Sequence, residues 1–179
     1  MSDAITAGVL PPGAGVRAAI RHFTTVVKVG AAQTGGAYCV LEHALDPGYV
    51  AMPVHSHRRE SKTLYVLAGA LAVQLGGAVS HAAAGATVLV PAGTPHTFWN
   101  ERPPAPAERD GRGPGEPARF LSVAAPAGLE RYYQAVAAHV PAQGPPNVDE
   151  ILALSAAHGI DVDMLGLLDI IERHEVRLA

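Results

Sequence analysis

Residues 85–100 read GATVLVPAGTPHTFWN, and this stretch decides the fold. The run 86–90 is rich in β-branched and aliphatic side chains, which favour a strand. That strand ends at Pro91, because proline cannot donate to a sheet ladder. Gly93 permits a tight turn, and the chain re-enters as a strand at His96. We therefore expect the imidazole of His96 to point toward the inside of a sheet structure.

Strand signals recur on both sides of this stretch. They are short runs of apolar and β-branched residues, and several are separated by glycine turns. The predicted strands are 22–29, 37–45, 63–67, 71–75, 86–90, 96–100 and 120–124. Many short strands with regular turn signals are typical of a β-sandwich or a β-barrel.

A second informative segment, residues 48–69, reads GYVAMPVHSHRRESKTLYVLAG. His55 and His57 are two positions apart, so on an extended chain both side chains face the same way. Neutral imidazole is a common ligand for first-row transition metals. The pair therefore indicates half of a metal site, and His96 is the third candidate ligand.

The two segments resemble the two sequence motifs of the cupin superfamily. The second motif is matched at each fixed position, namely Gly85, Pro91, Gly93, His96 and Asn100. From about residue 37 to residue 160 the chain is similar to single-domain cupins of the bacterial quercetinase-like type. The resemblance implies an all-β fold, the double-stranded β-helix or jelly-roll barrel, here with a C-terminal α-helical extension. It also implies a divalent transition metal (Fe, Mn, Ni, Cu, Co or Zn) held by His55, His57 and His96.

The first motif departs from the family at one position. The glutamate that serves as a metal ligand in relatives would fall at position 62, where this chain has Lys62. Glu60 is the nearest carboxylate and a possible fourth ligand. An ammonium about 4 Å from a divalent ion would be repelled by roughly 8 kcal/mol at an effective dielectric constant of about 20. Three outcomes relieve that repulsion: Lys62 loses its proton, Lys62 swings away, or no metal binds.

Lys62 is therefore the candidate catalytic residue. An unprotonated lysine in a pocket can act as a general base or as an amine that traps a carbonyl. Alternatively, its stem extends along apolar surface to the barrel mouth, or its ammonium pairs with Glu60. Both interpretations remain open from the sequence.

Three further residues are candidates for the pocket lining. Phe98 and Asn100 share the strand parity of His96 and are expected to face inward. Tyr65 is expected either to contact substrate or to lie in the core. His43 lies on a predicted strand, where a core histidine with its hydrogen bonds satisfied, or a surface histidine, is favoured over a pocket histidine.

The predicted organisation has one barrel domain and two flanking parts. Residues 1–20 are expected to form a flexible arm, and 21–125 to form the barrel, with a charged Pro/Gly-rich loop insertion at 101–118. Residues 126–179 show helical periodicity and are expected to form helices that pack on the barrel or on a partner subunit. Asn147 is a plausible N-cap for one of them.

Composition excludes several classes of partner. The net charge is −3 at pH 7 and no basic stripe is visible, so a nucleic-acid partner is not expected. Glycines and prolines divide the uncharged stretch 63–100 into strand-length pieces, so no membrane span is expected. The single cysteine, Cys39, and the lack of a signal-peptide pattern suit a cytoplasmic protein. A homodimer is the default expectation from symmetry.

Three functional hypotheses follow. The first is a metal-dependent, three-histidine, dioxygenase-like oxidoreductase acting on an aromatic or enol-bearing small molecule. The second is a metal-independent isomerase, cyclase or lyase that uses Lys62 and a histidine as its acid–base pair. The third is a non-catalytic cupin that binds a small ligand.

Overall fold

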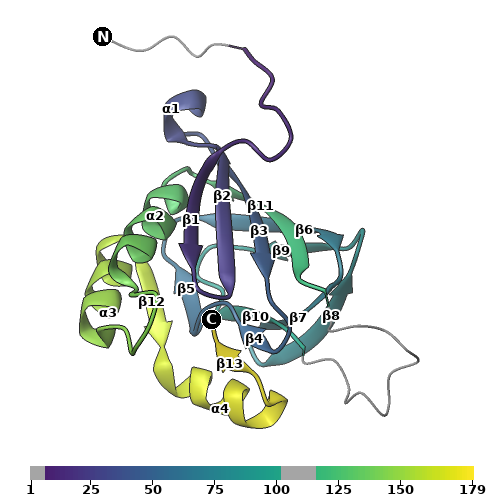
Figure 1. The fold of residues 1–179 in the computed structure, drawn as a ribbon, viewed down its shortest axis with the longest axis vertical. Coiled ribbons are helices and arrows are strands. Elements are labelled where there is room, and N and C mark those ends of the chain that lie inside the picture. Colours follow the sequence, from purple (N-terminus) through teal and green to yellow (C-terminus); the bar gives the residue numbers. More distant parts are fainter. Residues whose placement is uncertain (1–6, 102–115) are drawn as a thin grey trace.

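The computed structural model describes residues 7–101 and 116–179 (Figure 1). Most of the predicted loop insertion at 101–118 and the start of the predicted N-terminal arm lie outside the described residues. The chain folds as a jelly-roll barrel built from two packed sheets, with helices in its C-terminal part. The predicted fold class is confirmed.

The first sheet carries most of the main core. In spatial order its strands are β1 (Val16–Ile20), β2 (Phe23–Val29), β3 (Cys39–Leu45), β11 (Ala118–Ala125), β6 (Ser61–Ala68) and β9 (Thr87–Val90). Buried and partly exposed residues alternate strictly along β3, so one face of the sheet is buried inside the barrel. Leu41 and Leu45 of β3 pack there against Phe23 and Phe120 in one continuous apolar cluster.

The second sheet carries the predicted histidine motifs. Its strands in spatial order are β12 (Ile160–Asp163), β5 (Val54–His57), β10 (His96–Asn100), β4 (Tyr49–Val50) and β13 (Arg177–Leu178). β7 (Ala70–Leu75) also pairs with β10, and β8 (Ala78–Ala83) pairs with β7. The described pairs are antiparallel except β13 with β4, which is parallel.

The helices cover the barrel from outside. The four described helices are α1 (Ala31–Thr34), α2 (Leu129–His139), α3 (Val148–Ala157) and α4 (Met164–His174). α2 and α3 lie together on one side of the barrel, and α4 lies at its lower end in the view of Figure 1. Asn147 is the N-cap of α3, as predicted, and its Oδ1 accepts a hydrogen bond from the backbone N–H of Glu150 at 3.3 Å.

The two flanking regions differ from their predicted form. The expected arm over 1–20 is wrong for its last part, because Val16–Ile20 pair with β2 as strand β1. This strand has few strong β-formers, and its pairing with the β-branched strand β2 decides its conformation. The region 126–179 is also not purely helical, because β12 and β13 return to the second sheet. Consequently the C-terminal extension supplies a strand directly beside β5.

No helix among the described residues is long and apolar enough to cross a membrane. The homodimer and the cytoplasmic location stay predictions, because the structure describes a single chain.

A second, smaller apolar cluster fixes α4 to the outside of the second sheet. Trp99 of β10 is fully buried there against Leu167 and Ile170 of α4. Gly166 allows the close approach, since a Cβ at this position would lie 2.9 Å from Cγ2 of Val54. The outward face of β10 is thus closed by α4.

This packing predicts a contrast between two neighbouring positions of α4. Ile170→Ala removes a side chain that is 1% exposed and should lower the free energy of unfolding by about 2–5 kcal/mol. The matched control Leu168→Ala removes a side chain that is 61% exposed and should change it by less than about 0.5 kcal/mol. Urea denaturation measures both. Equal losses in the two variants would show that α4 does not dock through Ile170.

Candidate metal centre

Three histidine side chains from two neighbouring strands meet in the interior of the barrel. His55 and His57 lie on β5, and His96 begins β10, where it is the register partner of His55. Each of the three is at most 2% exposed. Their candidate ligand atoms all lie within 4.8 Å of one another. The structure therefore brings together the three residues that the two motifs singled out.

Backbone carbonyls fix the orientation of two of the rings. Nδ1 of His55 lies 2.8 Å from the carbonyl oxygen of Pro53, and Nδ1 of His96 lies 2.8 Å from that of Thr94. A carbonyl oxygen can only accept, so both Nδ1 atoms carry the hydrogen and both Nε2 atoms keep a free lone pair. Such outer hydrogen bonds are the usual way in which proteins orient metal-binding histidines.

The Nε2 atoms of the trio are buried and have no hydrogen-bond partner among the described residues. A buried polar atom without a partner costs free energy, so native structures rarely leave several of them side by side. A divalent transition metal bound by three neutral imidazoles would satisfy all three atoms at once. The residues present therefore fit a metal.

The surroundings keep these imidazoles neutral. Burial, reinforced by the positive charge of Lys62, lowers the pKa of His57 to about 2 and that of His96 to about 3. The same causes lower the pKa of His55 well below its ordinary value. Neutral imidazole is the form that binds metals, so no proton has to be displaced from these rings at neutral pH.

Lys62 lies on the inward face of β6. It is only 2% exposed and shares its strand parity with the buried residues Leu64 and Val66. Burial lowers the pKa of its ammonium to about 7, and the negative charge of Glu60 opposes part of that change. Of the two sequence interpretations, extension to the solvent at the barrel mouth is wrong, because the side chain stays in the interior.

Glu60 lies next to His57, on the side of the ring that carries Nδ1. Its Oε2 lies 3.7 Å from Nδ1 of His57, and Glu60 is 9% exposed. It is not a member of the cluster that can share one ion. Its carboxylate therefore faces the back of the ring, where a carboxylate can orient a metal-binding histidine. Service as a fourth ligand stays a prediction that would require the side chain to move.

The structure places the three predicted pocket residues in different environments. Phe98 points inward as expected and packs against Phe23 and Phe120 in the main core. Asn100 is buried, and its amide donates to the backbone carbonyls of Leu45 and Glu116. Its hydrogen bonds thus hold the end of β10 in place. The pocket role of Tyr65 is wrong, because its side chain is 45% exposed on the outer face of β6, one position out of phase with Lys62.

A fourth buried histidine, His43, lies among the aromatic rings of the main core. His43 of β3 is 1% exposed, its Nδ1 lies 2.9 Å from Oγ1 of Thr25, and its Nε2 lies 2.6 Å from Oγ of Ser122. Its ring stacks between Phe23 and Phe120, with centroids 5.1 and 4.8 Å away. Of the two favoured alternatives, the core histidine with its hydrogen bonds satisfied is confirmed, and the surface histidine is wrong. The hydroxyl partners could not be found from the sequence, because they come from two separate strands.

Comparison with known proteins agrees with this geometry. Residues 41–108 match the family described as Cupin_2, the cupin domain. A search of curated proteins finds no match to this chain.

Solved structures of the same fold are distant in sequence. KdgF from Halomonas sp. superposes with a TM-score of 0.56 at 16% identity, covering 70% of this chain and 99% of KdgF. The polyketide cyclase RemF from Streptomyces resistomycificus gives 0.53 at 22% identity, covering 67% and 80%. The nucleoside dehydratase Pac13 from Streptomyces gives 0.51 at 16% identity, covering 70% and 88%. These likenesses establish the fold.

A jelly-roll barrel with imidazoles from two such motifs in its interior defines the cupin class. Residues 41–108 match the cupin domain, and the barrel as a whole has the cupin fold.

The buried neutral His43 predicts a pH-dependent stability. In the unfolded chain a histidine takes up a proton below about pH 6.5, whereas burial lowers the pKa of folded His43 to about 3. The unfolded state therefore binds more protons in this window, so the contribution of His43 to stability is present above about pH 6.5 and is lost as the pH falls toward 3.

The test is His43→Gln, which removes this titration. The slope of unfolding free energy against pH between about pH 6 and pH 4 should decrease by one proton, about 1.4 kcal/mol per pH unit. Urea titrations at several pH values, with chelator present, measure the slope. An unchanged slope in the variant would mean that His43 gains its proton in the folded protein as readily as in the unfolded chain.

Proposed function

We propose that this chain is a metal-dependent cupin enzyme that acts on a small molecule carrying an enolisable carbonyl group. The observation that carries the proposal is the set of three buried Nε2 atoms without partners, beside a buried lysine. His55, His57 and His96 would hold the metal. When bound, a divalent transition metal supplies a Lewis acid that polarises oxygen groups of the substrate.

The residues around the trio give the site its rigidity. The carbonyls of Pro53 and Thr94 hold the rings of His55 and His96 in one orientation. The pairing of His55 with His96 fixes the two strands relative to each other. A site built on strands keeps its geometry better than one built on loops, and its burial excludes bulk water.

Lys62 is the residue to which we assign the stabilisation of negative charge. Its side chain is directed to the same interior, and its charge lowers the pKa of all three histidines. A cation held in a low-dielectric interior stabilises an enolate oxygen more strongly than it would in water. A glutamate at the same position would repel that charge, so the lysine favours a substrate that becomes anionic during the reaction.

These features support a non-redox reaction, such as an isomerisation, a cyclisation or a dehydration. Two proteins with this fold, a polyketide cyclase and a nucleoside dehydratase, carry out reactions of that class. In this scheme the substrate would be bound through its oxygens, and its charge would be balanced by Lys62.

A three-histidine dioxygenase acting on an aromatic or enol-bearing substrate is the second candidate. The observation that favours it is the all-nitrogen composition of the cluster, which leaves other positions around an ion open for substrate and O₂. Oxygen consumption by metal-loaded protein with a hydroxylated aromatic such as quercetin separates the two candidates. Uptake that is lost in His96→Ala would favour the dioxygenase.

Metal binding itself is tested by one substitution and a matched control. Protein purified without added metal should contain close to one equivalent of a divalent transition metal, and His96→Ala should lose most of it. The control His81→Ala changes a histidine that is exposed on β8 and should leave the content unchanged. Elemental analysis measures both. A wild-type protein free of metal, and unable to bind added Zn²⁺ or Ni²⁺, would instead support the metal-independent or non-catalytic alternatives.

The role of Lys62 is tested by comparing its charge-reversed and neutral variants. Lys62→Glu should bind Zn²⁺ about tenfold or more tightly than Lys62→Met, because an attraction replaces the lost repulsion. Titration calorimetry measures the affinities, and circular dichroism checks that both variants are folded. Equal affinities in the two variants would show that position 62 does not face the metal.

A further inference from the structure

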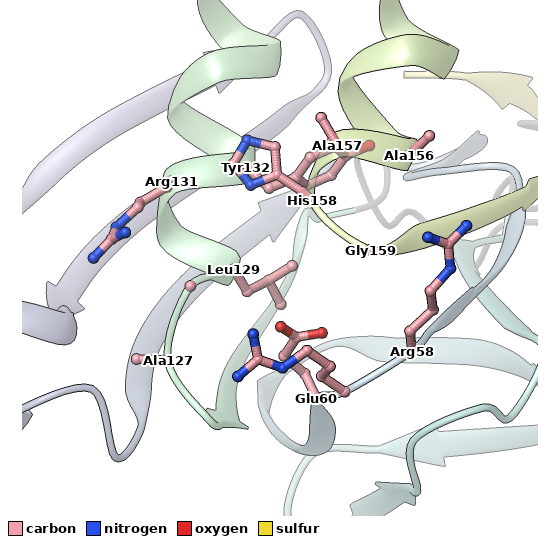
Figure 2. A pocket seen from close by; sticks show the side chains of 12 residues that line it. Arg58, Glu60, Ala127, Leu129, Arg131, Tyr132, Ala156, Ala157, His158 and Gly159 are labelled. Carbon is pink, nitrogen blue, oxygen red and sulfur yellow. The ribbon is translucent and has the colours of Figure 1, made fainter.

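A cleft of about 490 Å³ is lined in part by Glu60, the neighbour of His57. It is formed where three segments meet: the loop from β5 to β6, the start of α2, and the turn from α3 into β12 (Figure 2). Its volume is in the range of sites that bind small molecules. We call it the arginine cleft and define it by Arg58, Arg59, Glu60, Gly128, Arg131 and His158.

The walls of the arginine cleft carry an excess of positive charge. Arg58 is held by Asp161, with Nε–Oδ2 and Nη2–Oδ1 distances of 3.0 and 2.5 Å. Arg59 and Arg131 form no ion pair within the part of the chain that the structure describes. Figure 2 shows Arg131 and Arg58 on opposite sides of the cleft, with His158 above it. Guanidinium groups are the side chains best suited to bind carboxylate and phosphate.

The floor of the cleft is a buried carboxylate that also reaches the trio. Glu60 is nine-tenths buried, and its Oε2 has no hydrogen-bond partner among the described residues. This oxygen lies 3.7 Å from Nδ1 of His57. The other oxygen, Oε1, is the atom nearest to an added Cβ at Gly128, a residue of the cleft wall, at 3.9 Å. Glu60 therefore lines the cleft near Gly128 with Oε1, while its unpartnered Oε2 faces the ring of His57.

The arginines and the carboxylate of the cleft favour different chemical groups in a ligand. Two arginines without ion pairs call for an anion, whereas a buried ionised carboxylate accepts hydrogen bonds from hydroxyl groups. A ligand that satisfies both carries an acidic group and hydroxyls on one small framework. A plain hydrocarbon or a cationic ligand would satisfy neither.

We propose that the arginine cleft binds the acidic end of a hydroxylated small molecule, a carboxylate or a phosphate. Arg59 and Arg131 bind the anion, and Glu60 accepts a hydrogen bond from a hydroxyl. The proposal goes beyond the proposed function, because it assigns a ligand to a cleft whose lining does not include the three histidines.

The first test measures the binding of two probes, gluconate and inorganic phosphate, to the metal-loaded full-length protein by titration calorimetry. At least one probe should bind saturably, and added KCl should weaken the binding. The double variant Arg59→Ala/Arg131→Ala should lose about tenfold or more in affinity. The control Arg17→Ala, on the exposed strand β1, should bind as the wild type does. The probe that binds more tightly identifies the acidic group as carboxylate or phosphate.

A second test separates the carboxylate of Glu60 from the arginines. Glu60→Gln removes a negative charge from the cleft, so phosphate should bind about threefold more tightly. The affinity for gluconate should increase less, because the variant also lacks a charged acceptor for the hydroxyl groups of gluconate. An equal gain in affinity for both probes would show that Glu60 does not bind the hydroxyl groups of gluconate.

Metal analysis of the same samples distinguishes a failure of the metal-dependent function from a failure of the arginine cleft as a ligand site. The double arginine variant should retain its metal, and His96→Ala should lose metal while it still binds the probe. If the wild type holds metal but neither probe binds, or if Arg17→Ala weakens binding as much as the double variant does, the arginine cleft is not a ligand site. If the probe binds and no metal does, the metal-dependent function fails and the cleft remains.

Discussion

The antiparallel pairing of β5 with β10 is the constraint on which the rest of the site depends. It sets His55 opposite His96, and the two-residue period of the strand brings His57 to the same interior. Carbonyls of the residues just before each strand then orient two of the rings. A slip of one residue in this register would turn His96 outward and place Thr97 in the interior. Trp99 opposes such a slip, because its large side chain is buried on the opposite face under α4.

The interior of this barrel is unusually basic for a buried volume. Four histidines and one lysine lie there at no more than 2% exposure, and burial disfavours the charged form of each. The nearby carboxylate of Glu60 raises the pKa of Lys62 only in part. Such an interior is stabilised by lone-pair acceptors, such as metal cations, and by anions. That demand explains why a metal and a negatively charged substrate oxygen are the natural complements of these residues.

The local motifs could be predicted from the sequence, whereas contacts between distant segments could not. Pro91, Gly93 and the His-x-His spacing act over a few residues, so they predicted the turn, the strand and the three candidate ligands. The interior position of Lys62 depended on where β6 begins, and Tyr65 was placed inside because its strand parity was not counted from a fixed start. Strands with weak β-propensity, such as Val16–Ile20 and Ala78–Ala83, form because of their partners. The arginine cleft combines three segments spread over residues 58–159, and no short pattern reveals it.

Because strand β12 pairs with β5, the second sheet is complete only after the C-terminal extension has been synthesised. It pairs with β5 through Val162 opposite His55 and Ile160 opposite His57. During synthesis β5 therefore has an open edge until the chain has been made as far as Asp163. An open strand edge is a surface on which other chains can add. Both β5 and β4 thus gain a second strand partner only from the C-terminal extension, and the last segments of the chain cover their edges.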